Sequence, residues 1–258
     1  MEKTISRYDD TILNRCNFFK GLSKHEITAV LKAARIVNIP SNSFFFHQGE
    51  EAISFYIVVS GQVRLSQINP EGRQVIVHIF GPGDAIGIIV ALSNMTYPVS
   101  AEAMTDTQAL GWDRDTIAYL MEECPRLAVN GLHLIAHRFM ELQDRYRELA
   151  TERVERRIAR ALLRQAQQRN GRIPHTNIRN IALSRQDLAE MTGTTLYTVS
   201  RTCSSWEQEG IVTAGRGYIE INNFHKLLVI AEDLPDSHQC HDPQTCYFCP
   251  PDFNCNTA

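Results

Sequence analysis

The sequence predicts an α+β protein in which a β-rich region, a long helix, a helix-turn-helix with a closing hairpin and a cysteine-rich tail follow one another. Short β-branched and aromatic runs separated by turn residues occupy about residues 36–113. An apolar seam at heptad spacing follows in residues 125–150. Two helical patterns separated by a glycine then occupy residues 184–210.

The composition indicates a globular chain without a membrane span. The 258 residues are 43% hydrophobic and 21% charged, which suits one large or two smaller domains. No run approaches about 18 apolar residues, and MEKTISRYDD contains no apolar signal region. We therefore expect a cytoplasmic protein with reduced thiols, in which clustered cysteines indicate metal or redox chemistry.

The N-terminal half begins with a helix and continues as strands. Ser23 is a good N-cap for a helix through Ala34, and Glu26 completes a capping box. The runs SFYIVVSG, QVRLSQI and QVIVHIF alternate with NPEG, GPGD and SNMTYP. Several short strands at regular turn spacing predict an antiparallel barrel or sandwich.

The long helix is expected to begin near Pro125, a residue that suits a first helical turn. A 3.5-residue repeat favours a partner helix, and therefore a homodimer, over an amphipathic helix packed on its own domain. The seam consists of Leu132, Ile135, Phe139, Leu142, Tyr146 and Leu149.

The helix-turn-helix pattern begins at Ser184, which with Asp187 approximates a capping box, and turns at Gly193. Apolar residues of the second helix are expected to pack inward: Leu196, Val199, Cys203 and Trp206. Polar and aromatic residues then point outward toward base edges: Thr195, Tyr197, Thr198, Ser200 and Arg201. The alternative is an ordinary αα-hairpin with a solvated face. The run IVTAGRGYIEI adds a hairpin with Gly215-Arg216-Gly217 as its turn.

The net charge of −3 is unevenly distributed. Residues 151–222 carry eleven arginines and seven acids, whereas residues 231–258 carry five acids and no Lys or Arg. A basic block around a helix-turn-helix is typical of phosphate binding, although an excess of four charges is modest.

Together these features resemble the cyclic-AMP receptor and fumarate-nitrate regulator (Crp/Fnr) superfamily of bacterial transcription factors. The resemblance covers about residues 15–230 and rests on FFKGLS, FYIVVSGQV, FGPGDAIG, the long helix and SRQDLAEMTGTTLYTVSR. The resemblance implies a homodimer that binds palindromic DNA half-sites and works with RNA polymerase. It does not imply an enzyme. The implied parts are a jelly-roll-like β-roll sensor (1–124), a dimerisation helix (125–150), a winged helix-turn-helix (151–230) and an added tail (231–258).

Two departures from the family pattern concern its ligand. Where cyclic-nucleotide-binding members carry a Gly-Glu-Leu segment, this chain has Gly87-Ile88-Ile89. Where they carry Arg-Ser-Ala, it has Val99-Ser100-Ala101. The carboxylate and the arginine that clamp ribose and phosphate are both replaced, so we expect that cyclic AMP is not the effector.

The resemblance also assigns roles in DNA recognition. Arg201 falls on the position that reads guanine, and Ser200 on the one that contacts a neighbouring base. Tyr197 replaces the usual Glu, which changes specificity at one base step. Arg185 is expected to contact phosphate. The run LYTVSR is also similar to that of nitrogen-oxide-responsive members, on fewer residues.

The tail HQCHDPQTCYFCPPDFNC is the most unusual segment. Oxygen-sensing members hold an iron–sulfur cluster through N-terminal cysteines, but that region here offers only Cys16. The tail instead carries cysteines spaced C-x5-C-x2-C-x5-C: Cys240, Cys246, Cys249 and Cys255. Four thiolates suit a [4Fe–4S] cluster or a tetrahedral Zn²⁺.

The sequence therefore supports two hypotheses about the signal. In the first, the tail holds a [4Fe–4S] cluster that responds to redox state, oxygen or nitric oxide. In the alternative, an unknown small ligand other than cyclic AMP binds the β-roll. The tail then binds zinc, acts as a thiol switch or binds nothing.

Overall fold

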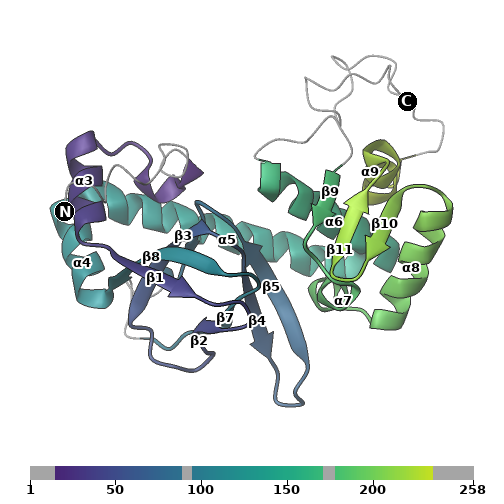
Figure 1. Cartoon of the computed structure of the whole chain (residues 1–258), viewed down its shortest axis with the longest axis horizontal. Coiled ribbons are helices and arrows are strands. Elements are labelled where there is room, and N and C mark those ends of the chain that lie inside the picture. The colour runs from purple at the N-terminus through teal and green to yellow at the C-terminus, as the bar shows by residue number, and fades with distance from the viewer. Residues whose placement is uncertain (1–14, 89–94, 171–177, 235–258) are drawn as a thin grey trace. The chain divides into compact units, whose positions relative to one another are not determined.

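The computed structural model describes residues 15–88, 95–170 and 178–234 (Figure 1). The chain divides into two compact units, Met1–Arg145 and Tyr146–Ala258, so the boundary lies within one helix. Among the described residues, none of the helices combines the length and the apolar character that a membrane span requires.

The first unit contains two antiparallel sheets of four strands each, with the orders β1-β8-β3-β6 and β2-β7-β4-β5 (Figure 1). The predicted antiparallel β-region is thereby confirmed. The strands are β1 (Arg35–Ile39), β2 (Phe44–Phe46), β3 (Ser54–Ser60), β4 (Val63–Ile68), β5 (Gln74–Phe80), β6 (Ala85–Ile86), β7 (Ser100–Ala103) and β8 (Thr107–Asp113).

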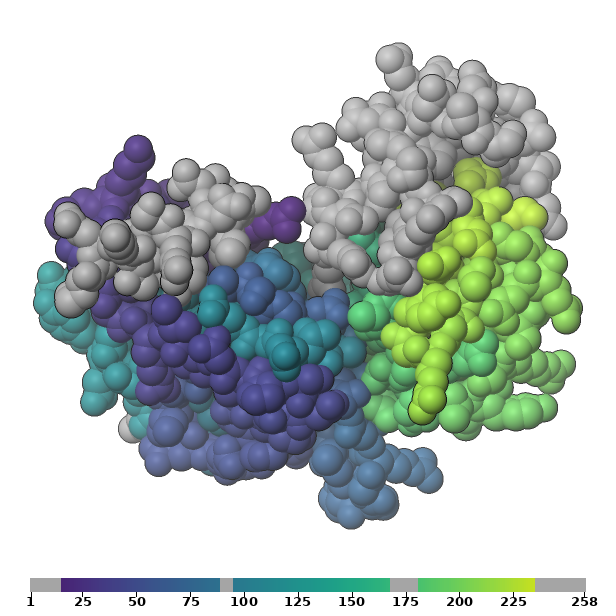
Figure 2. All heavy atoms as spheres, in the orientation of Figure 1, coloured from purple at the N-terminus to yellow at the C-terminus, as the bar shows by residue number. Residues whose placement is uncertain are grey.

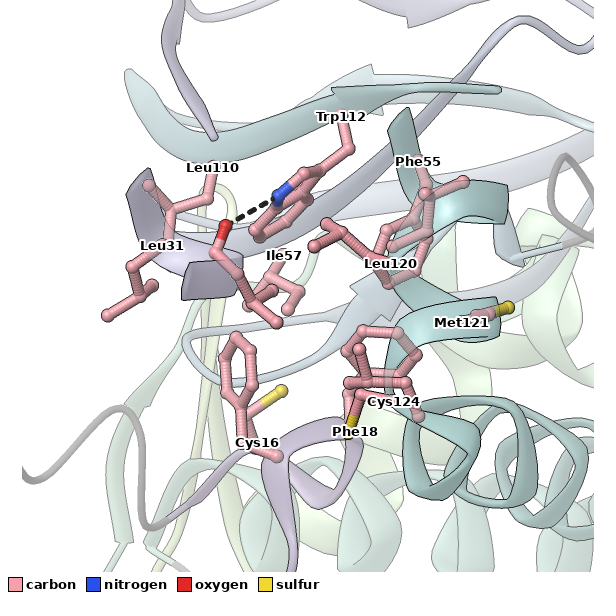
Figure 3. Close-up of a cluster of buried hydrophobic side chains, with 14 of the residues drawn as sticks. Cys16, Phe18, Leu31, Phe55, Ile57, Leu110, Trp112, Leu120, Met121 and Cys124 are labelled. Carbon is pink, nitrogen blue, oxygen red and sulfur yellow. Dashed lines mark hydrogen bonds between the residues drawn. The ribbon is translucent and has the colours of Figure 1, made fainter. Parts of the chain in front are cut away.

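Strand β3 separates two apolar clusters, which explains its continuous apolar sequence. Tyr56 and Val58 belong to a cluster that takes residues from both sheets. Phe55 and Ile57 belong to a second cluster, shared with β8 and the helices (Figure 3). In that second cluster the Trp112 indole Nε1 donates to the carbonyl of Val30 at 2.9 Å.

The helical elements of this unit are η1 (Asn17–Phe19), α3 (Lys24–Lys32), α4 (Arg114–Glu123) and α5 (Pro125–Thr151), which continues into the second unit. The predicted capping box of α3 is confirmed: Glu26 N donates to Ser23 Oγ at 3.3 Å, and Ser23 N to Glu26 Oε2 at 2.6 Å. On α5, Asn130 Nδ2 donates to the carbonyls of Phe18 and Lys20, so the long helix also anchors the N-terminal segment.

In its described residues, the second unit combines a three-stranded sheet of order β10-β11-β9 with four helices that follow α5 (Figure 1). Helices α6 and α9 pack against each other, as do α7 and α8. The elements are α6 (Val154–Asn170), β9 (Ile178–Ile181), α7 (Arg185–Thr192), α8 (Leu196–Gln208), β10 (Val212–Gly215), β11 (Tyr218–Ile221) and α9 (Phe224–Glu232).

The predicted closing hairpin is present, with a shorter turn than expected. Gly215 belongs to β10 and pairs with Tyr218, so only Arg216 and Gly217 form the turn. Gly217 has φ +82°, a left-handed conformation that favours glycine because a β-carbon would clash with the backbone there. The helix-turn-helix with its β-wing is therefore confirmed.

Candidate nucleic-acid interface

Helix α7 begins and ends as its sequence predicts. Ser184 Oγ accepts from Asp187 N at 3.0 Å, and Asp187 Oδ2 accepts from Ser184 N at 2.9 Å. The helix ends at Gly193, whose φ of +62° is left-handed. A β-carbon on Gly193 would lie 2.9 Å from Cδ2 of Leu149 in α5. Gly193 therefore allows both the turn and the close approach of the end of α5.

The inward face of α8 is mostly as predicted. Val199, Cys203 and Trp206 are buried, and burial raises the pKa of the Cys203 thiol to about 11. The prediction for Leu196 was wrong, because its side chain is 47% exposed. Leu196 is the first residue of α8. The apolar spacing of α8 therefore begins one turn before its first buried residue, Val199.

Helix α8 lies at the edge of its unit in Figure 1, and the segment is visible at the surface in the space-filling view of Figure 2. Tyr197 is 75% exposed and Arg201 is also exposed. Neither has a hydrogen-bond or ionic partner among the described residues. Thr195 Oγ1 caps the helix by accepting from Thr198 N at 3.2 Å, and the two threonine hydroxyls lie 2.9 Å apart. Ser200 is half-buried.

Arg185, expected at phosphate, has partners within the protein. Its Nη2 donates to the carbonyl of Ala214 at 3.2 Å and lies 3.6 Å from Glu207 Oε2. Glu207 Oε1 in turn accepts from Ala214 N at 2.8 Å. Arg185 and Glu207 thus hold strand β10 of the wing against α7 and α8.

Much of the basic block predicted from the sequence is neutralised internally. We call the following set the α6 arginine network: Arg156, Arg160 and Arg164 of α6 with Glu148, Glu152, Glu232 and Asp233. Glu148 is only 5% exposed, and its Oε1 lies 2.7 Å from Arg164 and 3.6 Å from Arg160. Arg160 also lies 3.2 Å from Glu232 in α9. The charge count therefore overstates the cations available for DNA.

The predicted seam of α5 is largely uncovered in the single chain. Leu132, Phe139, Leu142, Tyr146 and Leu149 are exposed, and Ile135 is half-buried. Phe139, for example, is 60% exposed. An apolar stripe of this length on one helix is typical of a surface that a partner covers.

Gly87 and Ile88, the described part of the segment Gly87-Ile88-Ile89, lie among apolar side chains. A β-carbon on Gly87 would lie 3.6 Å from the ring of Tyr97 and 3.7 Å from that of Phe46, and these rings stack at 3.7 Å. The Tyr97 hydroxyl donates to the carbonyl of Ser54 at 2.7 Å. Ile88 packs on the second cluster, near Gly131 of α5.

Two described residues near these segments show how the charge is arranged. Val99, at the position of the missing arginine, packs against the cluster between the sheets. Arg64 of the neighbouring strand β4 forms an ion pair with Glu102 at 2.6 Å. The described interior of the roll therefore offers mainly aromatic and aliphatic surface.

The described cysteines are buried thiols. Burial raises the pKa of Cys16 to about 12. The pKa of Cys124 is also raised, by burial and by its hydrogen bond to Glu26. Figure 3 shows Cys16 and Cys124 within the second cluster. The four tail cysteines lie outside the described residues, in which no metal-binding group of His, Cys, Asp or Glu occurs.

Comparisons with known proteins agree with this architecture. A family model for the cyclic nucleotide-binding domain matches residues 36–124, and one for the Crp-like helix-turn-helix domain matches residues 156–230. The cyclic AMP receptor protein of Thermus thermophilus is 31% identical over 216 residues, which are 84% of this chain and 97% of that protein. A CRP-like cAMP-activated global transcriptional regulator of Mycobacterium tuberculosis is 27% identical over 229 residues, 87% of this chain and 97% of that one.

A solved structure is similar too. That of FixK2 from Bradyrhizobium japonicum matches with a TM-score of 0.65 and 25% identity, covering 75% of this chain and 95% of that one. The fold and the helix-turn-helix define a DNA-binding transcription regulator, not an enzyme. The chain belongs to the Crp/Fnr family, whose Crp-like members bind DNA and act as dimers.

Proposed function

We propose that this regulator binds palindromic DNA as a homodimer and that its tail cysteines hold a [4Fe–4S] cluster responding to redox state, oxygen or nitric oxide. The exposed face of α8 supports the first part most directly. Arg201 is exposed there without a partner among the described residues, so its guanidinium is free for O6 and N7 of guanine. Ser200 and Tyr197 flank it, and Thr195 and Thr198 shape the first turn.

The test of base reading compares two arginines. Arg201→Ala is expected to cost about 1–3 kcal/mol at a preferred site and to relax the guanine preference. Arg185→Ala is expected to weaken binding to all sequences alike, because Arg185 positions the wing and reaches phosphate with its partly exposed side chain. Fluorescence anisotropy with matched and mismatched duplexes measures both. An Arg201→Ala protein that keeps the guanine preference would contradict the assignment.

The exposed seam of α5 supports the homodimer. Phe139→Glu is expected to give a monomer in sedimentation velocity, because two carboxylates would face each other in an apolar interface. Met140→Glu is the matched control, since Met140 is 64% exposed on the same helix but lies outside the seam. If both variants remain dimers, the seam is not the interface.

The roll residues do not fit a cyclic nucleotide. The phosphodiester needs a charge-assisted donor, and the described residues at Val99 and Ile88 supply none. We therefore expect no heat of binding when cyclic AMP is titrated into the protein at millimolar concentration. Micromolar affinity would overturn this inference.

The tail is the candidate sensor, because the described cysteines are buried among apolar groups and have raised pKa values. Cys240, Cys246, Cys249 and Cys255 supply four thiolates, a donor set that fits a [4Fe–4S] cluster. When bound, such a cluster supplies a redox-active group that also reacts with nitric oxide. Loss of the cluster changes DNA binding only if the cluster stabilises one of two protein conformations more than the other, and only if these conformations differ in DNA affinity.

Metal content of protein purified without oxygen tests the cluster. About four iron and four sulfide per chain are expected, as a [4Fe–4S] cluster requires. Cys246→Ser with Cys249→Ser should abolish them, whereas the matched control Cys124→Ser should keep them, because serine retains the bond to Glu26. Zinc alone would support the alternative of a structural clip and a ligand in the roll. Metal-free wild-type protein would favour a thiol switch or that ligand.

RNA polymerase is the protein partner that we propose for the DNA-bound dimer. Transcription in vitro with purified polymerase, with and without the regulator, tests this directly. An unchanged transcript level at a bound promoter would argue against a productive contact.

A further inference from the structure

The first turn of α8 exposes two successive apolar side chains. Leu196 is 47% exposed and Tyr197 is 75% exposed. The tyrosine hydroxyl has no hydrogen-bond partner among the described residues. Large apolar groups exposed next to each other are unfavourable in water unless a partner covers them.

These side chains are not needed to pack the helix-turn-helix. Val199, Cys203 and Trp206 already fill the inward face of α8, and each is buried. The helix start is fixed by Thr195, whose hydroxyl accepts from Thr198 N. Leu196 and Tyr197 therefore stand outside the core of their own unit.

Tyr197 already belongs to the proposed base-reading residues, and Leu196 is exposed next to it in the first turn of α8. In a helix, residues four apart are neighbours, so Leu196 lies beside Ser200 and Tyr197 beside Arg201. The exposed face thus pairs one cation with two apolar groups. In the major groove, the apolar feature of a base pair is the 5-methyl group of thymine.

We propose that Leu196 and Tyr197 read thymine through its 5-methyl group, next to the guanine contacted by Arg201. This inference rests on the proposed function, because it requires α8 to lie in the major groove. Four residues advance about 6 Å along a helix. At about 3.4 Å per base step, the thymine lies within about two steps of the guanine.

The experiment starts with full-length protein and a random-sequence DNA library, from which the preferred half-site is selected. Each thymine of that site is then replaced by deoxyuridine, which removes the 5-methyl group and leaves the base-pairing edge intact. Removal of one buried methyl is expected to weaken binding about fourfold, and about fifteenfold when both half-sites are changed. Fluorescence anisotropy at fixed salt gives the affinities.

Variants assign the contact to its residue. In Leu196→Ala or Tyr197→Ala, the deoxyuridine penalty should disappear at one position, because the methyl has lost its partner. Tyr197→Phe should keep the penalty, since only the ring contacts the methyl. Arg201→Ala is the matched control: it should lose the guanine preference and keep the deoxyuridine penalty. Circular dichroism melting shows whether each variant is folded.

The outcomes separate this inference from the proposed function. A protein that selects no preferred sequence would contradict the proposed function itself. A protein that selects guanine-containing half-sites but tolerates deoxyuridine at every thymine would overturn the methyl reading alone. A penalty that survives both alanine substitutions would overturn the assignment to Leu196 and Tyr197.

Discussion

Glu148→Gln removes one buried charge while leaving the side-chain shape unchanged. The carboxylate is 5% exposed and lies 2.7 Å from Arg164 and 3.6 Å from Arg160. A hydrogen bond to a charged group contributes about 1.5–3 kcal/mol. Arg160 retains Glu152 and Glu232, and the Arg164 side chain is 32% exposed, so water replaces part of the loss. We therefore expect a loss of about 2 kcal/mol, near the lower end of that range.

Thermal unfolding followed by circular dichroism measures this loss. For a unit of this size, about 2 kcal/mol lowers the melting temperature by about 10 °C. The matched control is Glu155→Gln on α6, because Glu155 is exposed and has no ionic partner among the described residues. The control is expected to change stability by less than about 0.5 kcal/mol. Equal melting temperatures for the two variants would refute the role given to Glu148.

Three further outcomes are expected. Gly193→Ala should destabilise more than Gly210→Ala, because both have positive φ but only at Gly193 does an added β-carbon meet another side chain, at 2.9 Å; equal losses would count against that close approach. A thiol reagent at pH 8 should leave Cys16, Cys124 and Cys203 unreacted in native metal-free protein, because burial raises the pKa of each thiol. Seven fast-reacting thiols would show that they are accessible. In the unfolded chain the Cys203 thiol ionises near its ordinary pKa of 9.0, whereas in the folded protein its pKa is about 11. The contribution of the neutral thiol to folding stability is therefore complete below the first value and is lost as pH rises toward the second. The urea midpoint should therefore fall over this range more steeply in wild type than in Cys203→Ala.

Local signals predicted the fold well. The capping boxes at Ser23 and Ser184 and the left-handed Gly193 depend on residues within one helical turn, and all are present. The strand-rich region was also evident, because β-branched runs between turn residues are a short-range pattern. The shorter hairpin turn at Arg216 depends on which residues pair across the strands.

Features that depend on tertiary contacts were harder to predict from the sequence. Leu196 follows the apolar spacing of α8, but that spacing does not show which turns of the helix are covered by the rest of the unit. Arg185 has the charge of a phosphate ligand, yet its partners Glu207 and Ala214 come from α8 and the wing. The pKa of Cys124 depends on burial and on Glu26, 98 positions away in the chain. Such pairings are set only when the chain has folded.

The α6 arginine network also connects the end of α9 to the end of α5. Glu232 and Asp233, at the end of α9, form ion pairs with Arg160 and Arg156. The guanidinium of Arg160 simultaneously grips Glu148, in the last turns of α5. A displacement of the end of α9 would therefore be transmitted to the end of α5 through the guanidinium of Arg160, and to Glu152 through that of Arg156. Glu232 and Glu148 are far apart in the sequence, but the side chain of Arg160 contacts both.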